Sequence, residues 1–103
     1  MDPTPDPQPG YAVYVDDNFH YMDEEHRYKL GDFSTCEAAT GACKAIVDEY
    51  LASAYEPGMN SSELLYSYHT FGEDPFITSG LNCSFSAWDY ASQRCHEICS
   101  PGT

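Results

Sequence analysis

The densest group of potential metal ligands in the sequence lies between two stretches that have the pattern of β-strands. The residues considered as ligands are Asp16, Asp17, His20, Asp23 and Glu24. Carboxylate oxygens suit Ca²⁺ and Mg²⁺, whereas imidazole suits transition metals. A calcium loop starting at Asp16 does not fit, because Tyr21 stands where such a loop needs glycine and Arg27 where it needs glutamate. A charged, solvated hairpin is the alternative interpretation.

Five cysteines offer a second kind of chemistry. They are Cys36, Cys43, Cys83, Cys95 and Cys99. Cys95 and Cys99 lie one helical turn apart and could share a soft-metal or redox site, although both also continue an apolar stripe typical of a core. Cys36 falls in the first turn of a predicted helix, where the helix dipole favours a thiolate nucleophile and the surrounding acidic residues oppose it. We expect the cysteines to be mostly free thiols in a reducing cytoplasm.

Aromatic residues on the predicted hairpin could form a recognition surface. The residues considered for this interaction surface are Tyr14, Phe19, Tyr21, Glu25 and Tyr28. Aromatic rings supply a large contact area at a small entropic cost, so they are frequent at interfaces. The same rings could instead form the core of a small sheet, and alternation alone places at least half of them inside.

The charge balance narrows the classes of partner. Seventeen Asp and Glu face four Lys and Arg, which gives a formal net charge of −13 on 103 residues. Such a charge repels phosphate backbones and anionic lipids, so we expect neither nucleic-acid nor membrane binding and instead expect a basic protein partner. The alternatives are a solvated surface without a partner, a cation site, or mimicry of a nucleic acid.

Alternating apolar residues predict a β-hairpin. From Tyr11 onward, β-branched and aromatic residues alternate, which predicts a strand with Val13 and Val15 on its inner face. A second alternating run covers Arg27–Phe33, and the acidic residues between the two runs form the tip. We expect the first strand to continue through a bulge to about Tyr21.

A long amphipathic helix follows the hairpin. Ser34 and Glu37 have the spacing of a capping box, and Pro57 and Gly58 end the helical pattern. The apolar residues between them recur every three or four positions, which predicts one buried stripe. The stripe consists of Ala39, Cys43, Ile46, Val47, Tyr50, Leu51 and Ala54.

Two shorter helices and a brief strand are expected in the rest of the chain. The second helix begins at an Asn60 cap with Glu63 and ends at Gly72, a third strand covers Phe76–Thr78, and Ser86 caps a last helix. The residues expected to face inward from these helices are Leu64, Tyr68, Phe71, Phe85, Trp88, Ala91, Cys95 and Ile98 or Cys99.

These elements predict an α+β fold in the order ββααβα. A β-hairpin and a short third strand form a small antiparallel sheet, which about three helices cover on one face. We expect a flexible Pro-rich tail over 1–10, one domain over 11–99 and a short tail over 100–103. No secretory signal or membrane-spanning stretch is recognisable, so the cytoplasm is the expected location.

Four segments resemble a family of small uncharacterised bacterial proteins. They are residues 14–23, 45–49, 71–77 and 85–91, and the similarity extends from Tyr11 to Cys95. The resemblance implies a bacterial, cytoplasmic, single-domain protein, and it assigns no activity, cofactor or functional residue.

We therefore expect a small acidic binding or regulatory protein without a cofactor. No catalytic constellation is recognisable from the order of the residues, so a non-enzymatic role is favoured and an enzyme stays an open alternative. The second hypothesis is a metal-binding or thiol redox protein that uses the acidic hairpin or the pair Cys95 and Cys99.

Overall fold

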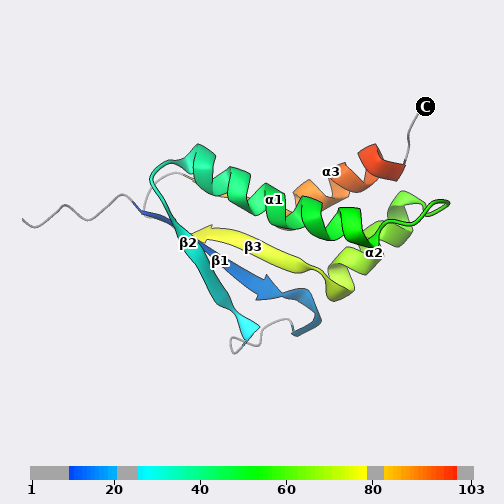
Figure 1. Ribbon diagram of the computed structural model, residues 1–103, viewed down its shortest axis with the longest axis horizontal. Coiled ribbons are helices and arrows are strands. Elements are labelled where there is room, and N and C mark those ends of the chain that lie inside the picture. The colour runs from blue at the N-terminus through cyan, green and yellow to red at the C-terminus, as the bar shows by residue number, and fades with distance from the viewer. Residues whose placement is uncertain (1–9, 21–25, 79–82, 100–103) are drawn as a thin grey trace, which may run out of the picture.

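The computed structural model describes residues 10–20, 26–78 and 83–99. This part of the chain folds into three strands and three α-helices in the expected order ββααβα, with a 3-10 turn between the first two strands (Figure 1). The α+β fold predicted from the sequence is confirmed. The expected N-terminal tail, apart from Gly10, and the expected tail over 100–103 lie outside the described residues.

A three-stranded antiparallel sheet is the base of the fold. Its strand order is β2-β1-β3, so that β1 (Tyr11–Asp17) lies between β2 (Tyr28–Phe33) and β3 (Glu73–Thr78). The third strand is longer than its predicted range, because Asp74 and Pro75 continue the pairing with β1. An edge strand tolerates Pro75, since the side of the strand facing away from the sheet needs no backbone donor.

The two faces of the sheet have different surroundings. Val13 and Val15 point toward the helices and are completely buried, as their alternation predicts. On the opposite face, Tyr14 stacks with Phe76 at 6.0 Å between ring centroids, and no helix of the described part covers this face (Figure 1). The sheet is therefore apolar on one side and mixed on the other.

The expected continuation of the first strand to Tyr21 is wrong. β1 ends at Asp17 and a 3-10 turn, η1 (Asn18–His20), follows. The Phe19 amide donates to Asp17 Oδ1 at 2.9 Å, a local side-chain bond that competes with further strand pairing. The bulge lies in β2 instead, where Leu30 is the additional residue between the pairs that Val13 and Tyr14 form. Tyr21 lies outside the described residues.

The long helix α1 (Cys36–Ala54) has the predicted stripe but a different cap. Thr35, rather than Ser34, is the N-cap, because its hydroxyl accepts a hydrogen bond from the Ala38 amide at 3.0 Å. Both hydroxyls stand three residues before an amide of the first helical turn, Thr35 before Ala38 and Ser34 before Glu37. The sequence spacing alone therefore does not distinguish the two caps. The completely buried positions of α1 are Ala39, Cys43, Val47 and Leu51.

The helices α2 (Ser61–Phe71) and α3 (Ala87–Cys99) begin where their caps predict. Asn60 and Glu63 form the expected reciprocal capping box, and the Ser86 hydroxyl accepts from the Asp89 amide at 3.3 Å. Two residues expected to face inward are instead exposed, Phe71 by 58% and Trp88 by 39%. Each finds a partner at the surface, since Phe71 stacks on Phe19 and Trp88 on His69.

Two apolar clusters hold the layers together. One lies between α1 and the sheet around Val13, and the other lies among the three helices around Leu51 and Tyr68, with Phe85 packed against both clusters. Among the described helices, none is long and apolar enough to cross a bilayer.

A disulfide joins two parts of the chain that are distant in sequence. Cys36, the first residue of α1, is bonded to Cys83, which lies 47 residues away and just ahead of α3. The expectation of free thiols holds for Cys43, Cys95 and Cys99 and is wrong for Cys36 and Cys83. The fold places the last two with their Cα atoms 5.9 Å apart, within the span that a disulfide requires.

Replacing both bonded cysteines tests the contribution of this disulfide to stability. Constraint of a loop of this length in the unfolded chain contributes up to roughly 4 kcal/mol, so Cys36→Ser/Cys83→Ser should lower the free energy of unfolding by about 2–4 kcal/mol. Urea unfolding followed by circular dichroism measures the change. A thiol reductant should destabilise the wild type to the same extent and leave the double variant unaffected. A double variant as stable as the wild type would contradict the prediction.

Candidate functional site

A concave acidic surface lies where α1 passes over one end of the sheet. We call it the acidic groove, and it encloses about 370 Å³. Its lining residues are Asp17, Ile46, Glu49, Tyr50, Ser53, Phe71 and Glu73. They come from the ends of β1 and α2, the start of β3 and the second half of α1, so only the tertiary fold brings them together.

Strand pairing places two of the carboxylates side by side. Asp17 and Glu73 form the last pair in the register between β1 and β3, and opposite residues of an antiparallel pair point to the same face. Glu49 belongs to α1, which lies above that face (Figure 1). Three carboxylates thus share the groove.

Burial and the proximity of these carboxylates change the pKa of Glu73. Burial, followed by the negative charges of Asp17 and Glu49, raises the pKa of the Glu73 carboxyl, whereas a hydrogen bond with Tyr28 lowers it. Burial and the Glu73 carboxylate in turn raise the pKa of Tyr28. Within the described residues, neither Glu49 nor Glu73 forms an ion pair. A cation in the groove would therefore give Glu49 and Glu73 an ion pair that they lack within the described residues.

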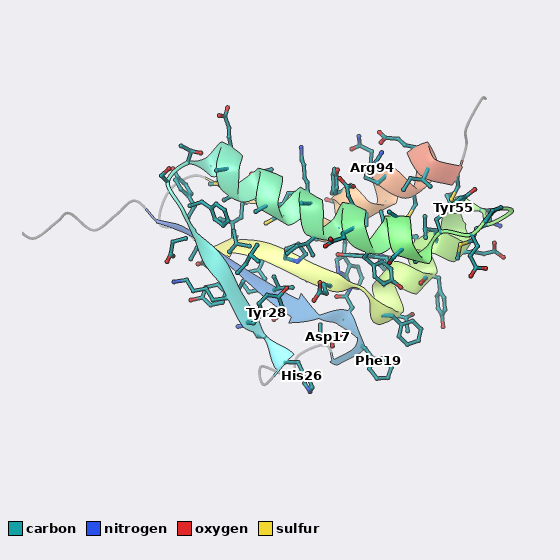
Figure 2. The ribbon with its side chains drawn as sticks, viewed as in Figure 1. Asp17, Phe19, His26, Tyr28, Tyr55 and Arg94 are labelled. Carbon is teal, nitrogen blue, oxygen red and sulfur yellow. A yellow bond between two sulfur atoms is a disulfide. The ribbon has the colours of Figure 1, made fainter. Side chains whose placement is uncertain are left out.

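Two exposed aromatic rings border the acidic groove. Phe19 and Phe71 stack with their centroids 5.4 Å apart and remain 60% and 58% exposed. The 3-10 turn positions Phe19, whose amide donates to Asp17 Oδ1 at 2.9 Å. In Figure 2, Asp17, Phe19 and Tyr28 lie toward the same end of the sheet.

The neighbouring Asn18 anchors this turn in the interior. Its Nδ2 donates to the Tyr68 carbonyl at 2.9 Å, while its Oδ1 is buried without a hydrogen-bond partner in the described structure. A buried acceptor without a hydrogen bond lowers the free energy of unfolding by about 1–3 kcal/mol, so this position of Asn18 reduces the stability of the protein.

The predicted interaction surface is only partly assembled around the groove. Phe19 and Tyr28 lie beside it, whereas Tyr14 lies on the opposite face of the sheet. Tyr21 and Glu25 lie outside the described residues. Sequence reasoning missed Glu49, Glu73 and Phe71. A longer third strand would have included Glu73, but its pairing with Asp17 depends on the sheet order, which no local signal gives.

The predicted metal ligands lie in different surroundings. Asp16 is bound by Arg27, whose Nε donates to Asp16 Oδ1 at 2.6 Å. Asp23, Glu24 and the side chain of His20 lie outside the described residues, and no group of three His, Cys, Asp or Glu elsewhere is placed to hold a metal ion. Of the two predicted carboxylate ligands whose side chains the structure describes, Asp17 lines the groove and Asp16 does not.

The predicted thiol pair lacks the environment of a reactive site. Cys95 is buried, and burial raises the pKa of its thiol to about 11. Burial also raises the pKa of Cys99. Both thiols stay protonated near neutral pH, whereas a nucleophilic or metal-binding cysteine needs the thiolate.

Comparisons of the chain with protein-family models, curated proteins and solved structures found no match. The resemblance to a bacterial family stays a prediction.

Asp74, next to the groove residue Glu73, gives a test of the electrostatics at this edge. Burial and the Asp16 charge raise the pKa of its carboxyl from 3.8 to about 6. The folded state therefore binds a proton that the unfolded chain releases. The resulting stabilisation is complete below about pH 3.8 and is lost as the pH rises through about 6.

The neutral substitution Asp74→Asn should remove this loss. We expect the variant to exceed the wild type by about 1 kcal/mol in free energy of unfolding at pH 7, a value discounted for partial exposure, and to match it at pH 4. Urea unfolding at both pH values measures the difference. Glu56→Gln, which removes the same charge at an exposed loop position, should show no such pH-dependent gain. A pH-independent difference for Asp74→Asn would argue against a raised pKa.

Proposed function

We propose that this chain is a small binding protein whose acidic groove receives a Lys or Arg side chain from a basic segment of a partner protein. The observation that carries the proposal is a concave surface with three carboxylates and two exposed phenylalanine rings on a chain of net charge −13. Carboxylates and aromatic faces both attract guanidinium and ammonium groups.

The protein's own basic residues support an external source for this cation. Each of the four Lys and Arg already has a partner within the chain. Arg27 binds Asp16, Lys29 binds Asp32, and Arg94 binds Asp48 and Glu97. Lys44 lies over the Tyr90 ring at 5.5 Å. A lysine or arginine side chain of this chain could enter the groove only by breaking one of these contacts. A side chain from another molecule has no such contact to break.

The chemistry of the groove favours an organic cation over a metal ion. A metal would need several oxygens at about 2.0–2.6 Å from one point, and no such cluster occurs among the described residues. A long basic side chain can instead contact carboxylates that stand apart and lay its apolar stem against Ile46 and Phe71.

Binding of a lysine- and arginine-rich model peptide tests the proposal. Glu49→Gln/Glu73→Gln should weaken binding roughly tenfold, which corresponds to about 0.7 kcal/mol for each of the two charges, of which Glu49 is exposed and Glu73 partly buried. Isothermal titration calorimetry at low salt measures the affinity, and amide shifts should map the peptide to the groove.

The matched control is Glu37→Gln/Glu56→Gln, which changes the net charge equally at exposed positions that do not line the groove. It should change the affinity less than about twofold. Equal losses in the two double variants would indicate attraction to net charge alone and would contradict a defined site.

The Cys36–Cys83 disulfide favours one second candidate, a thiol redox function. Here the bonded pair replaces the predicted Cys95 and Cys99. We propose the cytoplasm as the location, where thiol reductants would keep the pair open and an oxidant that accepts two electrons would close it.

Alkylation of thiols in intact cells tests location and redox behaviour together. Cys36 and Cys83 should be alkylated in unstressed cells and protected after exposure to peroxide, as mass spectrometry of the peptides would show. A pair that is protected in unstressed cells would contradict this candidate and indicate a permanent structural bond in an oxidising compartment.

A further inference from the structure

A second cavity lies between the outer edge of the sheet and the start of α3. It encloses about 390 Å³, and its lining residues are Asp74, Phe76, Phe85, Ser86, Ala87 and Trp88. Cavities of this size are within the range of small-molecule sites. Among the described residues, none lines both this cavity and the acidic groove.

Three aromatic side chains form most of its wall, and contacts with neighbours fix each of them. Trp88 stacks on His69 with 4.1 Å between ring centroids, and Phe85 packs against Tyr90 at 5.7 Å. The Arg27 guanidinium lies over the Phe76 ring at 5.1 Å, so this ring already interacts with a cation. Aromatic walls of this kind favour weakly hydrated cations.

Asp74 supplies a negative charge in the same cavity without a counter-ion. Its carboxylate is half-buried and has no hydrogen bond or ion pair within the described structure. Burial and the Asp16 charge raise the pKa of Asp74 to about 6, in the direction expected for a carboxylate that lacks a cationic partner.

We propose that this cavity binds an alkylated ammonium group, with Asp74 as its counter-ion and the Phe76, Phe85 and Trp88 rings around its methyl groups. Among the described lining residues, Asp74 and Ser86 are the polar ones, which leaves few side-chain acceptors there for the three N–H groups of a primary ammonium. An alkylated ammonium has fewer N–H groups that need acceptors, and its methyl groups can contact the aromatic rings. The net charge of −13 adds long-range attraction for any cation.

Choline and its uncharged isostere 3,3-dimethylbutan-1-ol provide the test. Trp88 is the only tryptophan in the chain, so its fluorescence reports on the cavity directly. We expect saturable binding of choline with a Kd in the millimolar range, about tenfold tighter than that of the alcohol. Equal affinities would overturn the role of the positive charge, and absence of saturation by choline would overturn the site.

Two variants separate Asp74 from the net charge. Asp74→Asn should weaken choline binding about tenfold, whereas Glu56→Gln should leave it unchanged. If both variants bind choline as the wild type does, the counter-ion role is excluded. Amide shifts confined to β3 and the start of α3 would support the location, and shifts elsewhere would refute it. Because the groove residues are intact in Asp74→Asn, loss of peptide binding and loss of choline binding can be distinguished.

Discussion

The buried side chain of Tyr68 is the interaction on which the arrangement of the other elements depends. Its ring is completely buried among the helices, and its hydroxyl donates to the Glu73 carbonyl at 2.6 Å. Its own carbonyl accepts from the Gly72 amide and from Asn18 Nδ2. One residue of α2 thereby fixes the end of β1 and the start of β3. Gly72 is required beside it, because a Cβ atom there would stand 2.5 Å from the Tyr68 ring.

This anchor explains how an acidic protein holds two carboxylates close together. Asp17 and Glu73 repel each other, yet the sheet register and the buried contacts of Tyr68 keep them adjacent. The cost appears as a raised pKa of Glu73 and as the unpaired Asn18 Oδ1. Such local strain is compatible with a binding site. A cationic ligand that lowers the repulsion around Glu73 would bind more tightly, because the free protein bears the energetic cost of that repulsion.

The charge of the chain is divided between paired and unpaired carboxylates. Three of the four basic residues form ion pairs, and the carboxylates they bind are Asp16, Asp32, Asp48 and Glu97. The fourth, Lys44, lies over an aromatic ring. Glu49, Glu73 and Asp74 have no such cation within the described structure, and they lie in two separate concavities with aromatic borders. Three carboxylates without a cation therefore lie where an external cation could enter, and both proposals rest on this placement.

The sequence by itself determined the elements, because apolar periodicity and local caps act within a few residues. It predicted the α+β order, the buried stripe of α1 and the Asn60 capping box. It placed Phe71 and Trp88 inside, since helical spacing cannot show where a neighbouring element ends. Only the tertiary structure decided the sheet order, the Cys36–Cys83 bond and the meeting of Asp17, Glu49 and Glu73. These depend on contacts between residues far apart in the chain, which local patterns do not encode.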